Sequence, residues 1–236
     1  MENFRLMNRT DTKYVLSFSK VPAILEGMNG NYRILTINGR NLFFYHTTYL
    51  DTPEYLFFNQ HVTGKRSRHK VRYRKYEINQ LTFLEVKKKT NKDRTVKWRM
   101  EDNLAVDGKC SQLAKEFINK HVPLSPLTLR PVLLNTFSRL TFVGTDISER
   151  VTVDFGIAYS DHAGKSESLK SVAVIEIKKD TLTARSPVAD MLKASAVYPG
   201  GFSKYCMGSA LLNRNLRINI LKPKLLLINK IENENL

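Results

Sequence analysis

The chain has 236 residues, 42% of them hydrophobic, which is enough for one large or two small domains. Its 38 Lys and Arg residues outnumber 22 Asp and Glu residues, so the formal net charge is +16, and this excess indicates an anionic partner: nucleic acid, an anionic membrane surface or a phosphorylated small molecule. No apolar run approaches the roughly 20 residues that span a bilayer, and the polar start at 1–10 lacks the apolar stretch of a signal peptide. We therefore expect a soluble, cytoplasmic protein whose two distant cysteines, Cys110 and Cys206, are reduced.

Alternating and helical patterns predict the elements in chain order. The first half is expected to contain a strand at 11–16, a helix at 21–28, a strand at 41–50, a hairpin of strands at 71–76 and 81–89, and a strand at 95–101. The second half is expected to contain a helix at 110–120, paired strands at 131–142 and 150–155, a strand at 171–178, and helices at 187–197 and 204–213. In the helix at 110–120, Ser111 is the expected N-cap, with Leu113, Phe117 and Ala114 on one side. We expect one domain over 1–215 and an ambiguous amphipathic tail over 216–236.

The most informative segment is the strand around residue 70. Side chains alternate between the two faces of a strand, so Arg68, Lys70, Arg72 and Arg74 share one face, opposite the apolar Val71 and Tyr73. Four cations in a row repel one another. A fold keeps such a face only if it is solvated or meets a dense polyanion.

Four other predicted strands combine an apolar face with a charged face. Their charged faces contain Glu85, Lys87 and Lys89; Lys97 and Arg99; Arg150 and Asp154; and Glu176 and Lys178. A closed antiparallel barrel with a charged lumen accommodates all of these strands. The predicted fold class is therefore α+β, built around an antiparallel β-barrel.

Arg72 and Arg74 are the strongest phosphate-binding candidates, because two guanidiniums two residues apart can each form forked hydrogen bonds to phosphate oxygens. The alternative is a solvated basic strand that binds RNA. That alternative predicts aromatic side chains for base stacking on the basic face. Tyr73 and His69 fall on the opposite face and no aromatic residues are evident on the basic faces, so we do not expect a nucleic-acid partner.

Two glutamates, Glu85 and Glu176, each precede a lysine by two positions. Either can be a counter-ion or can hold Mg²⁺ or Mn²⁺ against a phosphate chain; the clear alternation around Glu176 favours it as the metal ligand. Lys204 opens a predicted helix after two glycines, which suits a phosphate site and suits a surface cap equally. No P-loop, dinucleotide-binding motif, nucleophile elbow or zinc-ligand spacing is present in the sequence.

A series of short motifs occurs in an order that resembles a known family. The motifs are DTKY at 11–14, YLDT at 49–52, KVRYR at 70–74, LEVK at 84–87, NTFSR at 135–139, ERVTVD at 149–154, IEIK at 175–178 and FSKY at 202–205. Together, over about residues 5–215, they resemble the VTC domain, the polyphosphate polymerase branch of the triphosphate tunnel metalloenzymes (the CYTH-like superfamily). The resemblance implies a basic tunnel of antiparallel strands with helices packed outside.

The resemblance also implies an activity: transfer of the γ-phosphate of ATP to a polyphosphate chain, with Mn²⁺ or Mg²⁺ as cofactor and ATP and inorganic polyphosphate or triphosphate as partners. Arg72 and Arg74 would be the catalytic residues over the transferred phosphoryl group, and Glu176 would hold the metal. The phosphate-binding residues would be Lys13, Lys70, Lys87, Lys97, Arg139, Arg150, Lys178 and Lys204.

The first strand departs from the E-x-E-x-K pattern of the related cyclase and thiamine-triphosphatase branch, because Arg9 and Asp11 occupy the two glutamate positions. This loss of carboxylates favours polymerase-type over hydrolase-type metal use. Two alternatives stay open: a hydrolase of triphosphate or nucleoside triphosphates on the same fold, and a non-catalytic module that binds polyphosphate or RNA.

Overall fold

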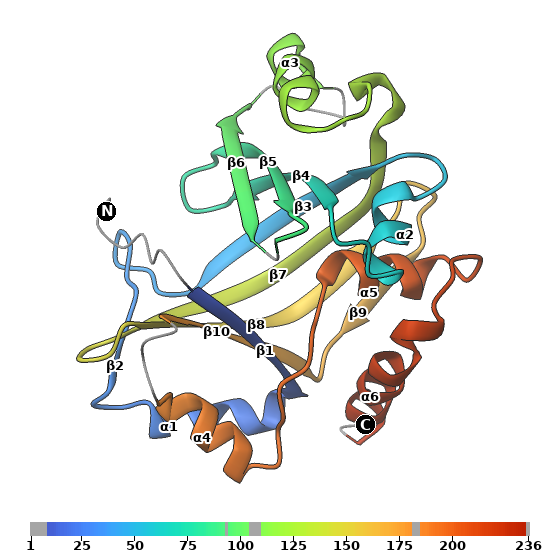
Figure 1. Cartoon of the computed structure of the whole chain (residues 1–236). Helices are drawn as coiled ribbons and strands as arrows, with labels where there is room; N and C mark the ends of the chain where they lie inside the picture. Colours follow the sequence, from blue (N-terminus) through green and yellow to red (C-terminus); the bar gives the residue numbers. More distant parts are fainter. Residues whose placement is uncertain (1–8, 93, 104–109, 181–184, 235–236) are drawn as a thin grey trace.

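The computed structural model describes residues 9–92, 94–103, 110–180 and 185–234, and a single antiparallel sheet dominates it (Figure 1). The strands are β1 (Arg9–Ser17), β2 (Tyr32–Ile34), β3 (Phe43–Asp51), β4 (Arg68–Tyr76), β5 (Thr82–Lys89), β6 (Thr95–Glu101), β7 (Arg130–Gly144), β8 (Glu149–Ser160), β9 (Ser166–Leu169) and β10 (Val172–Asp180). The α-helices are α1 (Val21–Gly27), α2 (Leu56–Val62), α3 (Gln112–His121), α4 (Pro187–Ala194), α5 (Lys204–Leu212) and α6 (Lys222–Asn233). Short 3₁₀ helices span Phe18–Lys20, Pro126–Thr128 and Asn219–Leu221.

All of the predicted strands and helices are present, and their boundaries differ from the predictions by a few residues. Ser111 caps α3 as expected, since its hydroxyl accepts from Ala114 N at 3.0 Å. The predicted side of that helix is partly wrong: Ala114 and Ile118 are buried, whereas Leu113 is 66% exposed. The short elements α2, β2 and β9 were not predicted, because each has too few residues for a periodic pattern.

The main path of the sheet runs β1-β10-β8-β7-β3-β4-β5-β6, with β2 paired to β7 and β9 paired to β8. Register shifts between Tyr49 and Leu50 and between Thr136 and Ser138 interrupt the ladders of β7, and such bulges bend a sheet. The curled sheet agrees with the predicted tunnel-like α+β fold. It is not closed by main-chain pairing, however, because β1 and β6 are the two ends of the described order. The expectation of a fully closed barrel is corrected here: alternation assigns side chains to faces but does not bring edge strands together.

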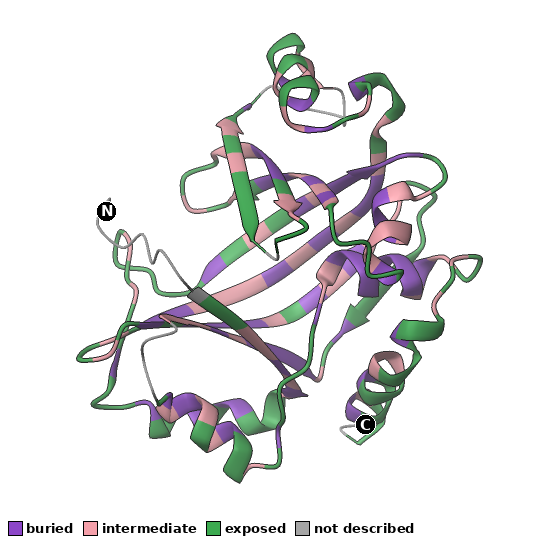
Figure 2. Ribbon diagram, viewed as in Figure 1, coloured by how far each residue is buried: buried purple, intermediate pink, exposed green. Residues whose placement is uncertain are grey.

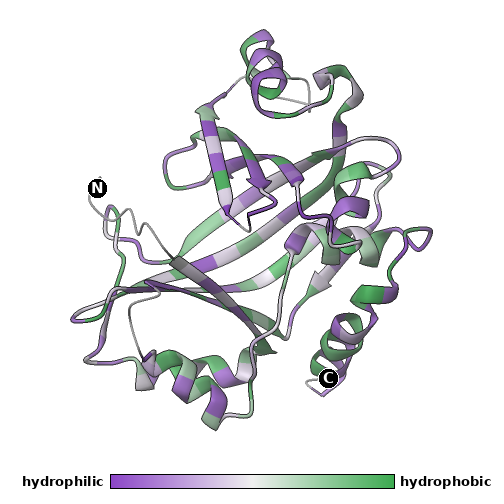
Figure 3. Cartoon of the chain, viewed as in Figure 1, coloured by the Kyte–Doolittle hydropathy of each residue, from purple (hydrophilic) through white to green (hydrophobic). Residues whose placement is uncertain are grey.

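The apolar faces of the strands are covered by helices, as Figures 1 and 2 show. Helices α1 and α4 lie together against Val151, Val153 and Ile175. Helix α3 lies against β5 and β6, in the core that contains Val71 and Val86. Figure 3 shows the alternation of hydrophilic and hydrophobic residues along these strands. Helices α1, α3 and α4 thus cover the face of the sheet that is opposite the charged residues.

The C-terminal segment forms α6, which contacts β1 and β10. Ile228 and Ile231 are buried in the cluster that also contains residues of α5. Glu232 fixes the helix to the turn before β10, where it accepts from the backbone N–H groups of Lys170 at 3.2 Å and Ser171 at 2.8 Å. None of the helices in the described ranges has the length and apolar character needed to cross a membrane.

Candidate functional site

The basic row of β4 lies on the concave face of the curled sheet. In the register with β5, Lys70 is opposite Lys87 and Arg72 is opposite Glu85. The alternate residues Val71 and Tyr73 are buried under α3, as predicted. The cations therefore face the inside of the curl because their neighbours in sequence are needed in the outer core.

Glu85 is the counter-ion of this part of the tunnel. Arg72 donates Nε and Nη2 to its Oε2 at 2.7 and 2.6 Å, and Lys97 from β6 contacts its Oε1. Burial alone would raise the pKa of Glu85, but the charges of Arg72, Arg74 and Lys97 outweigh it and lower the pKa to about 2. Glu85 is therefore ionised at neutral pH and already has two cationic partners.

Arg74 is in a different situation from Arg72. It is buried, and among the described residues no carboxylate lies within ion-pair distance of it. Its guanidinium lies 5.5 Å from the ring centroid of Tyr45 and 5.8 Å from that of Phe137. Burial lowers the pKa of Arg74 and the charge of Arg72 lowers it further. This arginine has hydrogen-bonding capacity for an anion from solution.

Tyr45 and Phe137 form an aromatic floor between several cations. The two rings stack with centroids 5.1 Å apart and planes 6° apart. Besides Arg74, the Arg139 guanidinium lies 5.3 Å and Lys204 Nζ 4.3 Å from the Phe137 centroid. Such contacts with the negative faces of the rings stabilise cations that have few carboxylate partners.

Asp154 joins β8 to the start of α5. Arg139 donates Nε and Nη2 to its two oxygens at 2.5 and 2.7 Å, and Lys204 contacts Oδ2. Although burial opposes ionisation, Lys204 and Arg139 hold the pKa of Asp154 well below its usual range. Ser203 caps α5, so Lys204 lies at the first turn of that helix with its head group inside the tunnel.

The carboxylates of Glu176 and Asp11 both contact one ammonium group, Lys178 Nζ. The distance from Lys178 Nζ to Asp11 Oδ2 is 3.3 Å. Lys13 is opposite Glu176 in the register of β1 and β10. Burial would raise the pKa of Glu176, but Lys13 and Lys178 lower it to about 2. Two carboxylates that converge on a cation form an oxygen-only set, which fits Mg²⁺ or Mn²⁺ shared with phosphate oxygens. No group of three or more His, Cys, Asp or Glu side chains in metal-binding geometry occurs among the described residues.

Several tunnel lysines have low pKa values. Burial lowers the pKa of Lys70 to about 7, with further lowering by Lys13, Lys87 and Arg72. Burial also lowers the pKa of Lys204 to about 8, against the opposing charge of Asp154. Lys87 remains accessible to water within the curl, yet the enclosing walls and then Lys13 lower its pKa to about 8. Because Lys13 lies on β1 and Lys87 on β5, their coupling indicates that these strands face each other across the tunnel.

The structure thus brings most of the predicted site residues together on one concave face: Lys13, Lys70, Arg72, Arg74, Lys87, Lys97, Arg139, Glu176, Lys178 and Lys204. Arg150 is different. It is opposite Lys178 in register but is exposed near the start of β8, so it is not enclosed with the others. Lys97 lies on the edge strand β6, and its side chain is 42% exposed.

One expectation about this face is wrong. Aromatic residues do lie beside the cations, but they come from other strands: Tyr45 from β3, Phe137 from β7 and Phe83 from β5, whose ring centroid is 4.9 Å from Arg99. The alternation of Tyr45, Thr47 and Tyr49 along β3 is the sequence signal that could have indicated Tyr45 on this face. Phe137 is fully buried and lies against three cations, so its ring is not open for base stacking.

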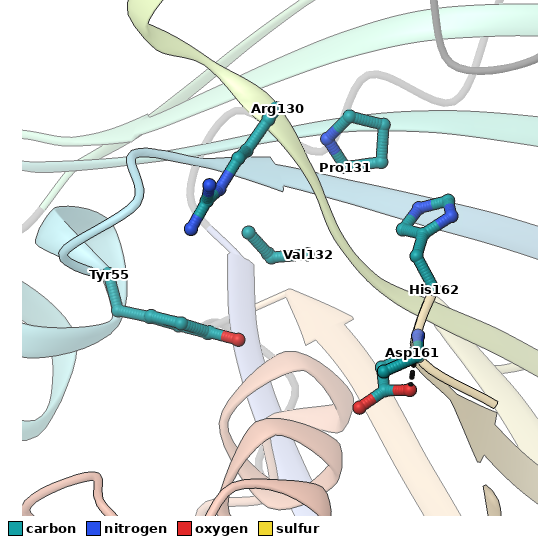
Figure 4. Close-up of a pocket in the computed structure, with 7 residues that line it drawn as sticks. Tyr55, Arg130, Pro131, Val132, Asp161 and His162 are labelled. Carbon is teal, nitrogen blue, oxygen red and sulfur yellow. Dashed lines mark hydrogen bonds between the residues drawn. The ribbon is translucent and has the colours of Figure 1, made fainter. Parts of the chain in front are cut away.

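A surface pocket lies apart from this site (Figure 4). It has a volume of about 500 Å³ and lies between the start of α2, the start of β7 and the turn after β8. Its lining residues are Tyr55, Arg130, Pro131, Val132, Asp161, His162 and Ala163. None of the predicted site residues lines it.

The fold of the chain is similar to that of several solved structures. A putative adenylate cyclase from Vibrio parahaemolyticus matches with a TM-score of 0.51 and 12% identity, over 85% of this chain and 97% of that one. One from Bacillus halodurans matches with a TM-score of 0.52 and 12% identity, over 83% and 94%. A putative adenylyl cyclase from Hippeastrum, described as having a dominant triphosphatase activity, matches with a TM-score of 0.51 and 11% identity, over 89% and 98%.

These similarities define the class of fold, a curled antiparallel sheet with helices packed against it. A family model, the VTC domain, matches residues 8–213, and the chain belongs to that family. A comparison with curated proteins finds no match.

Proposed function

We propose that this protein is a metal-dependent polyphosphate polymerase that transfers the γ-phosphate of ATP to a polyphosphate chain held in the tunnel. The observation that supports the proposal most directly is Arg74, a buried guanidinium without a carboxylate partner among the described residues, in the middle of a cationic row. Transfer of a phosphoryl group needs positioning and charge stabilisation more than covalent help from the protein. Fixed cations on a concave face supply both.

The roles follow from the partners of each side chain. Arg74 is the cation best able to bind the transferred phosphoryl group, and Arg72, held by Glu85, adds a second guanidinium beside it. Arg139 and Lys204 are oriented by Asp154 and bind neighbouring phosphates. Lys13 and Lys87 bind the chain from opposite walls. Each carboxylate thus orients cations and keeps their mutual repulsion tolerable while the tunnel is empty.

Glu176 and Asp11 are the residues that would hold a divalent ion, in the place where Lys178 Nζ contacts both carboxylates. When bound, Mg²⁺ or Mn²⁺ would neutralise charge on the phosphate oxygens. Lys178, which contacts both carboxylates, would then be available to bind phosphate. The charge of Arg139 also lowers the pKa of Glu176, so Arg139 lies near enough to bind the same phosphates.

A hydrolase of triphosphate or nucleoside triphosphates on the same fold is the second candidate. Its support is the Hippeastrum neighbour with triphosphatase activity, although 11% identity demonstrates only a common fold. Two of the tunnel carboxylates, Glu85 and Asp154, do not favour it, because each is engaged by two cations and neither is free to activate a water molecule. A module that binds polyphosphate without catalysis is the third outcome.

One assay separates these outcomes. The purified protein is incubated with ATP and either Mn²⁺ or Mg²⁺, and the products are resolved on a gel and assayed for free phosphate. Chain growth supports the polymerase. Phosphate release without chains identifies the hydrolase. If the protein binds polyphosphate but forms neither product with either metal, the catalytic proposal is wrong.

A further inference from the structure

A second group of cations lies at the end of the tunnel where α2, α5 and α6 meet. Lys70 Nζ donates to Ser203 Oγ at 2.9 Å, and Lys13 Nζ donates to the carbonyl of Phe202 at 3.0 Å. A Cβ built at Gly201 would lie 3.3 Å from Lys224 Nζ. The segment before α5 therefore contacts one lysine from each of β4, β1 and α6.

The pKa of His61 is affected by the positive charges at this end of the tunnel. Burial lowers its pKa, and the positive charges of Lys70, Arg68, Lys224 and Lys13 lower it further, to about 3. The imidazole is therefore neutral, and its buried Nδ1 has no hydrogen-bond partner among the described residues. The principal charges acting on it are all positive, and so are those acting on the thiol of Cys206 in α5, where Lys70, Lys224 and Arg68 oppose the rise in its pKa caused by burial.

Cations without carboxylates are costly to hold together unless an anion joins them. No ion pair links Lys224, Arg68, Lys70 or Lys13 to a carboxylate in the described part of the chain. The ion pairs that Glu85 and Asp154 form at the centre of the tunnel have no equivalent among these cations. This end of the tunnel therefore contains cations without carboxylate partners among the described residues, which is the arrangement that binds an anion.

Lys224 belongs to α6, which lies beyond residues 8–213 matched by the VTC domain. Its position is fixed, because Ile228 and Ile231 are buried and Glu232 accepts two backbone hydrogen bonds from the turn before β10. The side chain of Lys224 is half-buried, whereas Lys222 in the same helix is exposed. Helix α6 therefore adds Lys224 to the group of cations that begins with Arg68 and Lys70 on β4.

We propose that Lys224 and Arg68, with Lys70, form an additional phosphate site at this end of the tunnel, which binds the distal part of a linear polyphosphate longer than triphosphate. The inference rests on the proposed binding of polyphosphate and extends it to chain length. Arg74 and Arg68 are six residues apart on β4, roughly 20 Å at about 3.3 Å per residue. A triphosphate bound at Arg72 and Arg74 leaves the α6 end empty, and a longer chain reaches it.

The test compares inorganic tripolyphosphate, a long linear polyphosphate and inorganic phosphate as ligands, by titration calorimetry without ATP. The variants are Lys224→Gln and Arg68→Gln, which keep polar side chains, with Lys222→Gln as the matched control on the exposed face of α6. Loss of one charge-assisted contact should weaken long-chain binding about tenfold. Tripolyphosphate binding should stay within twofold of the wild type, and Lys222→Gln should leave both affinities unchanged. Thermal melting establishes that each variant is folded.

Equal weakening of both phosphate polymers in Lys224→Gln, or of neither, would overturn the inference. Loss of inorganic phosphate binding with intact long-chain binding would also overturn it, since the site would then belong to free phosphate. If wild-type protein binds long chains in a Lys224-dependent way but makes none from ATP, the site is supported and the polymerase proposal alone is wrong. If it binds neither polymer, both are wrong.

Discussion

The guanidinium of Arg74 lies 5.5 Å from the ring centroid of Tyr45, and among the described residues no carboxylate pairs with it. Two positions earlier on the same strand face, Arg72 forms a short ion pair with Glu85. Neighbouring arginines with the same chemistry therefore have opposite electrostatic surroundings. The folded state stabilises the charge of Arg72 and destabilises that of Arg74.

Arg74→Met should raise the stability of the free protein and reduce its activity. Removing a buried cation whose pKa is lowered relieves repulsion with Arg72, with a gain of about 0.5–2 kcal/mol expected. If Arg74 stabilises charge that develops during transfer, kcat should fall on the order of 10²-fold while KM for ATP changes little. Denaturant unfolding and steady-state kinetics measure both, with exposed Arg33→Met as the control. Weaker ATP binding at an unchanged kcat would limit Arg74 to ground-state binding.

Arg72→Ala should reduce both stability and activity, in contrast to Arg74→Met. The substitution leaves the buried carboxylate of Glu85 with Lys97 as its one ion-pair partner among the described residues, and breaking a buried ion pair costs about 3–5 kcal/mol. Part of this loss should be recovered in the double variant Arg72→Ala with Glu85→Gln, because the charge is then removed. A double variant that is no more stable than the single one would show that Glu85 is solvated well enough without Arg72.

Glu176→Gln should abolish Mn²⁺-dependent turnover and leave the fold intact, since the amide keeps the shape of the carboxylate and loses its charge. A binding readout independent of activity is available: titration of Mn²⁺ into protein saturated with a non-hydrolysable ATP analogue, followed by electron paramagnetic resonance. Asp11→Asn should weaken Mn²⁺ in the same titration, because both carboxylates contact Lys178. Undiminished metal-dependent turnover in Glu176→Gln would assign the metal to Glu85 or Asp154 instead.

Binding of triphosphate should weaken as the pH rises through 7 to 9. Lys87 and Lys204, with pKa values of about 8, lose protons in this range in the free protein. A bound phosphate anion favours their charged forms and raises these pKa values again, so binding takes up protons there. Calorimetry at one pH in buffers of different ionisation enthalpy counts these protons. Lys87→Arg keeps a permanent charge and should flatten the pH dependence; a profile identical to wild type would exclude Lys87 from the effect.

Asp51 should be the most important single polar residue for the stability of the α2–α5 region. Its buried carboxylate accepts from the backbone N–H groups of Phe57 and Phe58, both at 2.9 Å, and from the hydroxyl of Tyr205. Asp51→Ala leaves these donors unsatisfied and should cost about 3–5 kcal/mol of unfolding free energy. Tyr205→Phe removes one donor alone and should cost about 1 kcal/mol. Equal losses in the two variants would mean that the helix N–H groups find other partners.

The sequence was sufficient to place nearly every long strand and to assign its charged and apolar faces. The alternation around Lys70, Arg72 and Glu176 is a local property, because a strand repeats every two residues and its buried face must be apolar. The cap of α3 at Ser111 was also predictable from the sequence, since a cap is recognised from its nearest neighbours.

Only the tertiary structure decided which charges meet. Asp154 and Lys204 are 50 positions apart, and Asp11 and Lys178 are 167 positions apart, so their pairing depends on how far the sheet curls and on where α5 enters it. The aromatic floor of Tyr45 and Phe137 and the approach of Lys224 to Gly201 depend on strand order and helix packing in the same way. A periodic pattern determines the direction of a side chain from its own strand, whereas its partners are set by contacts between distant segments, which no local pattern contains.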